Sequence, residues 1–522
     1  MTFLKHILQA MEKLVARLGK NRVVLITGFT ICYAVVTYLL ASRKDLWNDE
    51  LYTYYIAKLP SMTEVWKALM SGGEQTPPFF YLLTRASISL LGLNSFALRL
   101  PEMIGFWIMC VCLFLLVARR TSNCYALLAS IFPLITYTYY YAYEARPYGL
   151  VLGFGTLAFL CWQGVIMNRF RLLSIIGLSI SLAAALSSHY YGVFAIFPLA
   201  LGETVRSIVR RRLDVPVWAA FAFAILPLAW HLPLILEARS YSVGFWAKAQ
   251  WMDIPTFYIN MLSTVAVPLI VLLFFSVIYQ IVWADKKPDA NRTSPMYELP
   301  VFEITAALGF IIIPVICVIL GKFVTGAFVD RYAITAIIGF SVLVPLMAAK
   351  LNNNNSLIST LLVICFVGWF GLLALKHTWK LDIIPPEAKI QLLKRKDVKN
   401  LPIVAADPYT FIDLNYYAPD LTSRVVYLAD PEISFRRLRT NSVERGMVDL
   451  LKPWFRLNVT DYKSYILRQP QFLLCGDPTF FSWIVPQLEE DGFKLELKGL
   501  DGKLMLFIVS SPSFRNNNGI LF

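Results

Sequence analysis

Long apolar runs dominate this chain and decide what it can fold into. The runs cover residues 23–40, 104–117, 150–166, 217–236 and 357–375. Each approaches or exceeds the roughly 20 apolar residues that an α-helix needs to cross the hydrocarbon core of a bilayer. Overall, 57% of the residues are hydrophobic and only 16% are charged. The sequence therefore predicts a polytopic α-helical membrane protein and excludes a soluble or singly anchored one.

The positive charge of the chain is unevenly distributed. The formal net charge is +14, yet residues 377–522 carry 19 Lys and Arg against 17 Asp and Glu. Most of the excess therefore lies between the apolar runs, where basic residues mark cytoplasmic loops. This distribution indicates a membrane topology and argues against a nucleic-acid partner.

The basic clusters predict a path through the membrane. The amino-terminal residues are basic and lead into a full-length span without a small-residue cleavage site, so they are expected to stay cytoplasmic. The other clusters expected on that side are residues 119–120, 168–171, 206–212, 284–292 and Lys350. Neighbouring clusters enclose enough apolar sequence for two crossings each, which gives about 11 spans with the carboxyl end outside. The segments expected outside are residues 43–100, 143–147, 187–191, 237–255, 321–332 and everything after 376.

The first outer loop, residues 41–100, contains two predicted juxtamembrane helices. Residues 78–92 are apolar but only about 15 residues long, and a crossing there would place the next basic cluster outside. A second helix is predicted by i, i+3, i+4, i+7 spacing of the apolar residues Met62, Val65, Trp66 and Leu69. Both segments are expected to lie in the membrane interface.

Residues 377–522 are expected to form an extracytoplasmic α/β domain after the transmembrane domain, residues 1–376. Strand-like runs at 401–405, 424–428, 471–475, 493–497 and 504–509 alternate with helical stretches such as 411–417 and 483–490. The domain contains no Gly-x-Gly-x-x-Gly motif and no phosphate loop, so no nucleotide site is predicted. A structural or acceptor-docking cap is the interpretation that remains for it.

Two adjacent carboxylates, Asp49 and Glu50, follow the first apolar run and are surrounded by aromatic residues. One interpretation is that they are solvated loop acids, which are common in membrane proteins. The other is that hydrocarbon and aromatic groups partly desolvate them, which raises a carboxylate pKa and favours general-base chemistry on a hydroxyl. Spacing alone leaves both interpretations open.

A second charged pair is expected on the same side. Between residues 123 and 166 the only charged side chains are Glu144 and Arg146. A charge at bilayer depth is unfavourable by about 2.5–3.5 kcal/mol, so the pair is predicted at the outer turn between two crossings. A local ion pair is the alternative, although i, i+2 spacing does not favour one on a helix.

Residues 321–332 bring Lys322, Arg331 and Tyr332 to the start of a later span, again on the outer side. The planar guanidinium of Arg331 suits a phosphate oxygen. An interfacial anchor formed by Arg331 and Tyr332 is the alternative. His189 is the only histidine at an outer turn of the membrane half, and a lone histidine is more often a hydrogen-bonded wall residue than a catalyst.

Short motifs along the first 350 residues occur in a characteristic order. They are Asp49-Glu50 after the first span, Gly-x-Gln-Thr-Pro-Pro at 73–78, Ala97-Leu98-Arg99-Leu100-Pro101, Glu144-Ala145-Arg146-Pro147-Tyr148 and Asp330-Arg331-Tyr332. This order resembles the GT-C membrane glycosyltransferases. The most similar branch is the bacterial part of the dolichyl-phosphate-mannose protein mannosyltransferase family, which includes the lipid A aminoarabinose transferase. The resemblance covers roughly residues 20–350 and does not include the C-terminal domain.

The resemblance implies a bacterial inner-membrane enzyme that transfers a sugar, with inversion, from a polyprenyl-phosphate carrier to a protein, lipid or polysaccharide acceptor. Asp49 would be the catalytic acid that deprotonates or orients the acceptor hydroxyl, and Glu50 would position a substrate beside it. Glu144 and Arg146 would lie near the donor cavity, and Arg331 would neutralise the leaving lipid phosphate. The further candidates for substrate binding are Tyr332, Tyr143, His189, Lys322 and Arg99.

The resemblance leaves the cofactor and one motif position open. No nucleotide site is needed, because the sugar arrives on a lipid, and a divalent cation near Asp49, Glu50 and Glu144 is neither required nor excluded. Thr76 stands where many relatives carry His before Pro-Pro, so no role for a histidine can be transferred to it.

A multispan transporter or flippase of lipid-linked sugars is the alternative function. Such proteins are typically built from internal repeats with broken helices at mid-membrane. This sequence shows no repeat, and its charges are predicted at the outer ends of the spans. A receptor or scaffold, a third class, would make the tail the active part and leave Asp49 replaceable.

Overall fold

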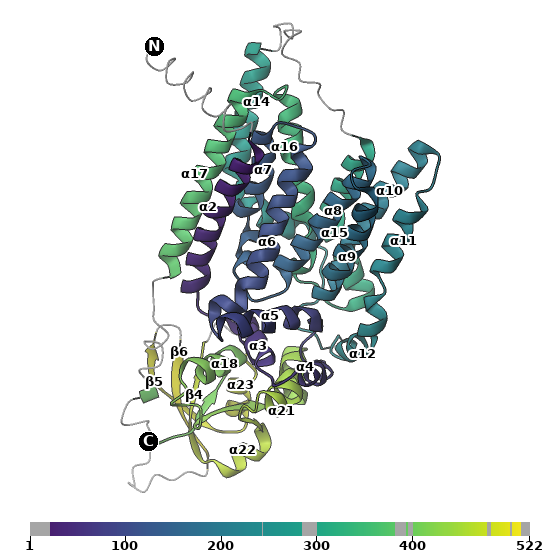
Figure 1. The fold of residues 1–522 in the computed structure, drawn as a ribbon. Helices are drawn as coiled ribbons and strands as arrows, with labels where there is room; N and C mark the ends of the chain where they lie inside the picture. The colour runs from purple at the N-terminus through teal and green to yellow at the C-terminus, as the bar shows by residue number, and fades with distance from the viewer. Residues whose placement is uncertain are drawn as a thin grey trace, which may run out of the picture.

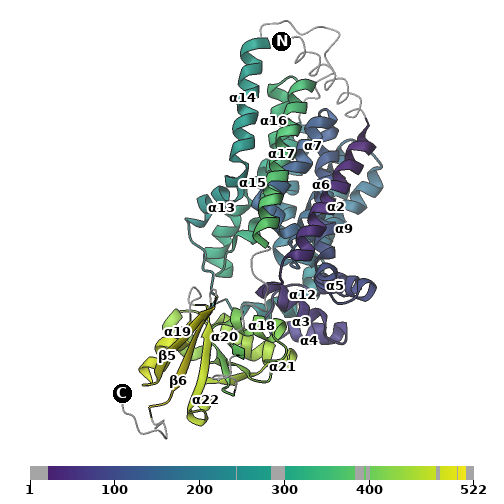
Figure 2. The same cartoon turned by 90° about the vertical axis from the view of Figure 1, so that its left-hand side faces the viewer.

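A bundle of long apolar helices carries an α/β domain on one of its ends (Figures 1 and 2). The computed structural model describes residues 21–242, 244–283, 300–381, 393–394, 400–477, 482–501 and 504–512. The basic residues before Asn21 and the predicted cytoplasmic cluster at 284–292 lie outside the described residues.

Within the described residues, nine segments are long and apolar enough to cross a membrane. Four are single helices: α2 (Arg22–Arg43), α6 (Ser95–Ala118), α8 (Tyr148–Ile166) and α9 (Arg171–Ser188). Four are composite: η3 (Tyr190–Ala195) with α10 (Ile196–Arg210), α11 (Val215–Ala224) with α12 (Pro227–Arg239), α13 (Asp253–Leu262) with η4 (Ser263–Val265) and α14 (Ala266–Trp283), and α15 (Val301–Leu320) with η5 (Gly321–Thr325). The last is α17 (Ser356–Leu381).

Two shorter apolar helices also lie in the bundle (Figure 1). The first is α7 (Asn123–Ile131), continued by η1 (Phe132–Ile135), and it packs against α6, α16 and α17. The second is α16 (Ala336–Leu351), which packs against α15. Counted with the nine longer segments, they make eleven apolar segments in the bundle among the described residues, and 11 is the number of spans that the charge pattern predicts.

Short helices lie at the end of the bundle that carries the C-terminal domain (Figure 1). They are α3 (Asn48–Ala57), α4 (Met62–Leu69), α5 (Pro78–Leu91), η2 (Tyr137–Ala142) and η6 (Asp330–Ala333). The α4 helix buries Val65 and Leu69 and exposes Lys67, as its amphipathic spacing predicts. With 14 residues, α5 is about 21 Å long and lies across the bundle, consistent with the prediction that it does not cross the membrane.

Charged residues pair with one another at the opposite end of the bundle. Arg120, after α6, forms an ion pair with Glu303 at the start of α15. Arg171 and Arg206 both pair with Asp214, which precedes α11, at 2.6 and 3.1 Å. These arginines belong to clusters that the sequence assigns to a single side of the membrane, and the structure gathers them at one end.

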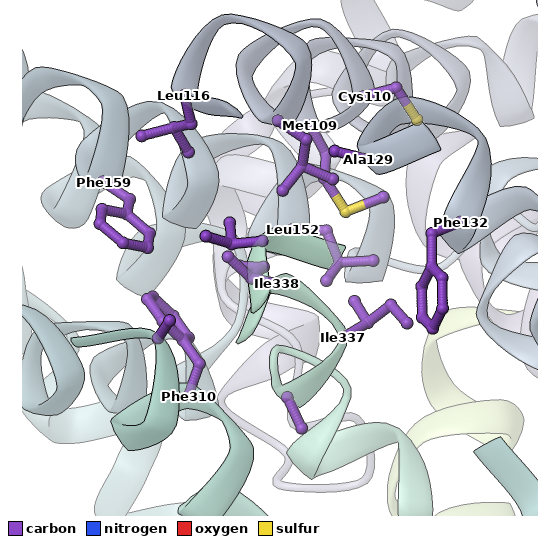
Figure 3. Packing of buried hydrophobic residues seen from close by; sticks show 14 of the residues in the cluster. Met109, Cys110, Leu116, Ala129, Phe132, Leu152, Phe159, Phe310, Ile337 and Ile338 are labelled. Carbon is purple, nitrogen blue, oxygen red and sulfur yellow. The ribbon is translucent and has the colours of Figure 1, made fainter. Parts of the chain in front are cut away.

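Apolar side chains from α6, α7, α8, α15 and α16 fill the centre of the bundle (Figure 3). Phe159 of α8 stacks on Phe310 of α15, with ring centroids 5.8 Å apart. Met109 of α6 and Leu152 of α8 are fully buried in the same cluster. This packing fixes the helices from whose ends the candidate site is built.

Glycines let α6 and α8 approach each other closely. An added Cβ at Gly153 would lie 2.2 Å from the carbonyl oxygen of Gly105. At Gly149 it would lie 2.5 Å from the carbonyl oxygen of Glu102. Backbones can touch in this way only where small residues occupy the crossing.

Replacing Gly153 with Ala is expected to destabilise the protein by about 1–3 kcal/mol, because the two helices must move apart. The matched control is Gly155→Ala on the same helix, where the new Cβ would lie 3.5 Å from its nearest neighbours, an ordinary contact. Both changes gain the same helix propensity, so the difference isolates the steric clash. Thermal unfolding of the purified protein in detergent measures it, and equal melting of the two variants would contradict the close crossing.

The C-terminal domain is built on a six-stranded sheet of order β3-β2-β1-β4-β6-β5. The first four strands in this order are parallel, and β6 and β5 continue the sheet antiparallel. The strands are β1 (Ile403–Ala405), β2 (Val425–Ala429), β3 (Val459–Asp461), β4 (Gln471–Gly476), β5 (Lys494–Asp501) and β6 (Leu504–Ser510). The five predicted strands are present, and β3 was missed because it has only three residues and ends on polar ones.

Helices cover both faces of this sheet. They are α18 (Pro408–Tyr417), α19 (Pro431–Leu438), α20 (Ser442–Gly446), η8 (Met447–Leu451), α21 (Lys452–Trp454), α22 (Tyr462–Arg468) and α23 (Ile484–Glu490). The predicted helical stretches at 411–417 and 483–490 correspond to α18 and α23.

The C-terminal domain is fastened to the bundle by hydrogen bonds. The hydroxyl of Tyr417 accepts from the backbone N–H of Leu46 at 2.7 Å and donates to its carbonyl at 3.0 Å. The carbonyl of Gly244, between α12 and α13, accepts from the hydroxyl of Thr440 and from the N–H groups just before and at the start of α20, at 2.7 to 3.2 Å. These hydrogen bonds fix the position of the C-terminal domain relative to the helical bundle.

Candidate active site

A cavity of about 820 Å³ lies between the helical bundle and the C-terminal domain. Five predicted site residues line it: Asp49, Arg146, His189, Arg331 and Tyr332. They come from α3, the turn before α8, the turn after α9, and η6. Segments that are far apart in the sequence, and that were all expected outside the membrane, thus meet at one end of the bundle.

Asp49 and Arg331 form the central contact of the cavity. Oδ2 of Asp49 lies 3.2 Å from Nη2 of Arg331, and both side chains are about one-fifth exposed. Burial alone would lower the pKa of Arg331, but the neighbouring Tyr148 and Asp49 raise it, so the guanidinium stays charged. Its Nε is buried and has no hydrogen-bond partner, which leaves a donor for a further anion.

Arg146 forms a second ion pair on the same wall, with Glu74. Two nitrogens of Arg146 donate to the Glu74 carboxylate at 3.0 and 3.2 Å, and the Thr76 hydroxyl donates to it at 2.6 Å. Burial alone would raise the pKa of Glu74, but Arg146 and Thr76 lower it by a larger amount. The net pKa lies below the ordinary value, so the carboxylate is ionised. Arg146 also keeps a buried Nε without a partner.

His189 and Tyr332 form an aromatic wall beside these charges. The ring of Tyr332 stacks on Tyr191 with centroids 4.3 Å apart, and His189 contacts Tyr332 at 5.7 Å. Burial, together with Arg146 and Arg331, lowers the pKa of His189 to about 3, so the imidazole is neutral. Its Nδ1 accepts from the N–H of Tyr191 at 3.2 Å. His189 is thus a hydrogen-bonded wall residue, the more common outcome for a lone histidine.

Glu50, expected to act next to Asp49, does not line the cavity. Its carboxylate is fully buried and accepts two hydrogen bonds of 2.7 Å from Arg99 and one of 2.7 Å from the N–H of Ala145. Lys44 lies 3.3 Å away. Burial raises the pKa of Glu50, but Lys44 and Arg99 lower it by more, so it stays ionised. The Arg99 guanidinium also donates to the carbonyls that follow α2, so it ties α3 to the end of that helix and does not reach the cavity.

Glu144 lies behind the cavity wall, so the structure does not place it where the resemblance implies. Its side chain is buried, and neither carboxylate oxygen has a hydrogen-bond partner. The nearest cation is Lys44, at 3.8 Å. Burial, opposed by Lys44, raises the pKa of Glu144 to about 7. Tyr143 lies beside it, with its ring 5.9 Å from the Lys44 ammonium.

Lys322 also lies off the cavity wall. Its ammonium donates to the carbonyl of Ala249 at 3.2 Å and lies 5.3 Å from the ring of Trp251. The candidates that the structure does not bring into the cavity are therefore Glu50, Glu144, Tyr143, Arg99 and Lys322.

A metal site is not formed by the described residues. Among residues 21–512 with the gaps given above, no three His, Cys, Asp or Glu side chains come together in a way that could hold a metal ion. Asp49 pairs with Arg331 and Glu50 with Arg99, so cations neutralise two of the three acids near which the sequence leaves a divalent ion open.

Two charged site residues were missed by sequence reasoning. Glu74 occupies the variable position of the 73–78 motif, and only its pairing with Arg146 shows its importance. Lys44 lies between Glu50 and Glu144 at the end of α2. Its signal in the sequence was a basic residue in a segment expected outside, whereas basic residues are more common in cytoplasmic loops.

Comparison with known proteins identifies the fold. The sequence matches no protein-family model and no curated protein. The crystal structure of ArnT from Cupriavidus metallidurans in the apo state is similar, with a TM-score of 0.57 and 11% identity over 92% of this chain and 98% of that one. The structure of the same protein bound to undecaprenyl phosphate has a TM-score of 0.55 and 12% identity, with the same coverage. The chain is therefore a polytopic helical membrane protein with a C-terminal α/β domain, and its fold is similar to that of ArnT.

Proposed function

We propose that this protein is a glycosyltransferase that moves a sugar from a polyprenyl-phosphate-linked donor to an acceptor hydroxyl, with inversion at the sugar carbon. The observation that carries the proposal is the pairing of Asp49 with Arg331, beside Arg146, in one cavity of an ArnT-like fold. Support for the donor comes from ArnT, which has been crystallised with undecaprenyl phosphate bound.

The charges in the cavity suit the two halves of this reaction. Asp49 takes the proton of the acceptor hydroxyl while its oxygen attacks the anomeric carbon. The bond between that carbon and the phosphate oxygen breaks, and the electron pair leaves with the lipid phosphate. Arg331 and Arg146, both of which line the cavity, would stabilise the charge that develops there.

The charge distribution supports an orientation with the paired arginines of the far end in the cytoplasm. The cavity and residues 377–522 would then lie outside the cytoplasm of a bacterial cell, with residues 1–376 as the transmembrane domain. In this orientation a site at this end of the bundle would lie at the membrane interface, close to the head group of a lipid-linked donor.

The test is consumption of a panel of undecaprenyl-phosphate sugars by the purified full-length protein, with methyl glycosides or water supplying the hydroxyl that takes up the sugar, followed as release of undecaprenyl phosphate. We expect at least one donor to be cleaved. Arg331→Met should slow cleavage by about 100-fold or more, because a cation facing the developing charge is lost. Arg468→Met, an exposed position at the end of α22, is the matched control. Movement of an intact donor across liposomes without cleavage would favour the flippase alternative.

A further inference from the structure

The carboxyl ends of the parallel strands in the C-terminal domain open onto the cavity. In the sheet order, β1 and β4 are parallel neighbours, with β2 and β3 on one side and β6 and β5 on the other. The chain turns in opposite directions after these two strands, which makes their boundary the topological switch point where open α/β sheets bind ligands. Residues that follow β1 (Ala406, Pro408) and β4 (Ser482, Trp483) line the cavity opposite Asp49.

Helix α20 adds two polar groups without partners to this wall. Glu444 and Ser442 both line the cavity, and their side chains are only 4% and 8% exposed. One oxygen of Glu444, Oε1, accepts from the hydroxyl of Tyr427 at 2.6 Å and from the indole N–H of Trp483 at 2.9 Å. Its Oε2 and the hydroxyl of Ser442 have no hydrogen-bond partner. Buried polar atoms of this kind are normally satisfied, so two on one cavity wall point to a missing ligand.

The distribution of charge separates the two sides of the cavity. Among the described lining residues, the cations Arg146, Arg239 and Arg331 all belong to the bundle, where they outnumber the acids Asp49 and Glu74. The C-terminal domain contributes no cation to the described lining and one carboxyl group, that of Glu444, whose pKa burial raises to about 7. An anionic group is therefore favoured next to the bundle and disfavoured next to α20. A neutral group rich in hydroxyls has the donors that a carboxylate and a serine oxygen accept.

The geometry favours a saccharide over a peptide as the occupant. Peptides commonly add a strand to an exposed sheet edge, but the edges of this sheet are β3 and β5. The cavity lies instead at the strand ends, where it is lined by the aromatic residues Tyr427 and Trp483 and by small polar groups. Compact polyhydroxyl ligands fit such a pocket of mixed apolar and hydrogen-bonding character.

We propose that α20 and the ends of β1 and β4 form the acceptor subsite, which holds a saccharide through hydrogen bonds from its hydroxyls to Glu444 and Ser442. The acceptor role rests on the proposed function, because it places one acceptor hydroxyl toward Asp49 across the cavity. The donor phosphate then occupies the arginine side of the bundle, and the C-terminal domain selects the acceptor. This gives the domain a part in substrate recognition beyond covering the site.

Binding of saccharides can be measured without any turnover. The full-length protein in a zwitterionic detergent, which lacks a sugar head group, is tested by saturation-transfer NMR against methyl glycosides of glucose, galactose, mannose and N-acetylglucosamine. We expect at least one glycoside to bind and Glu444→Gln to weaken its binding by about tenfold or more, since an NH₂ donor replaces one of the two acceptor oxygens of the side chain. Glu432→Gln, an exposed position on α19 outside this cavity, should bind as the native chain does.

Further variants separate the subsite from the chemistry. Asp49→Asn should keep glycoside binding while losing transfer, so a failure of the proposed reaction leaves the binding result intact. Ser442→Ala removes one hydroxyl and should weaken glycoside binding severalfold. If Glu444→Gln proves unstable on heating, Ser442→Ala serves as the variant that tests the subsite. Three results would each overturn the proposed subsite. The first is a native chain that binds none of the glycosides, the second is binding by both α20 variants as tight as that of the native chain, and the third is a native chain that binds a serine-containing peptide in preference to a glycoside.

Discussion

Asp49→Asn is expected to lower the rate of sugar transfer by about 10²–10⁴-fold, the usual contribution of a positioned general base. Asparagine keeps the size of the side chain, and its oxygen can still accept a hydrogen bond from Arg331. It cannot take up a proton from an acceptor hydroxyl, so the loss should fall on turnover and leave donor binding nearly unchanged. Single-turnover cleavage of the preferred undecaprenyl-phosphate sugar, with binding measured separately, gives both quantities.

The stability of this variant should stay close to that of the native chain. The Asp49–Arg331 pair is about one-fifth exposed on both sides, and ion pairs in contact with solvent contribute about 1 kcal/mol or less. Asp420→Asn, at an exposed carboxylate of the C-terminal domain paired with Lys394, controls for a general effect of removing an acid. Full transfer activity in Asp49→Asn would remove Asp49 as the base, and a collapse in melting temperature would show that its main role is structural.

The architecture could be predicted from the sequence because it follows from strong, local patterns. Apolar length and basic clusters predicted the spans, and the i, i+3, i+4 spacing around Val65 predicted α4. The same patterns predicted Asp49, Arg146 and Arg331 on one side of the membrane, and in the structure all three line one cavity at one end of the bundle. The sequence predicted that these distant turns lie on the same side of the membrane, because the segments that carry these three residues were all assigned to the outer surface.

The partners of individual side chains could not be predicted in this way. Three α-helices, α5, α6 and α7, separate Glu74 from Arg146 in the sequence, so no sequence period relates the two residues. Glu144 carries the right charge in the right turn, yet its side chain points behind the wall toward Lys44. The α20 residues looked like part of an undistinguished tail, and only the docking of that domain on the bundle brings Glu444 to the cavity.

Adjacent residues on a helix point in directions about 100° apart, which explains why Asp49 and Glu50 have separate surroundings. Asp49 faces the cavity and Arg331, whereas Glu50 faces the bundle and Arg99. The spacing of the two acids in the sequence does not show which of them lines a cavity. The start of α3 at Asn48 decides which of them lines the cavity.

Glu50→Gln is therefore expected to act mainly on stability, lowering the free energy of unfolding by about 3–5 kcal/mol, as when one partner of a buried ion pair is removed. Arg99 is fully buried and Lys44 nearly so, so the substitution leaves cations without a counter-charge. The ion pair holds the pKa of Glu50 below its ordinary value. Its stabilisation is thus complete at neutral pH and lost as the pH falls through that lowered pKa, so melting should be compared near pH 7.

A double-mutant cycle with Arg99→Met distinguishes this role from a chemical one. If the two residues act as a pair, the double variant should be more stable than the sum of the single losses predicts, because the Arg99 guanidinium is no longer left buried without its counter-charge. Any loss of activity in Glu50→Gln should then follow from displacement of α3 and recover in part in the double variant. A Glu50→Gln protein that melts like the native chain but fails to transfer sugar would instead return Glu50 to the reaction beside Asp49.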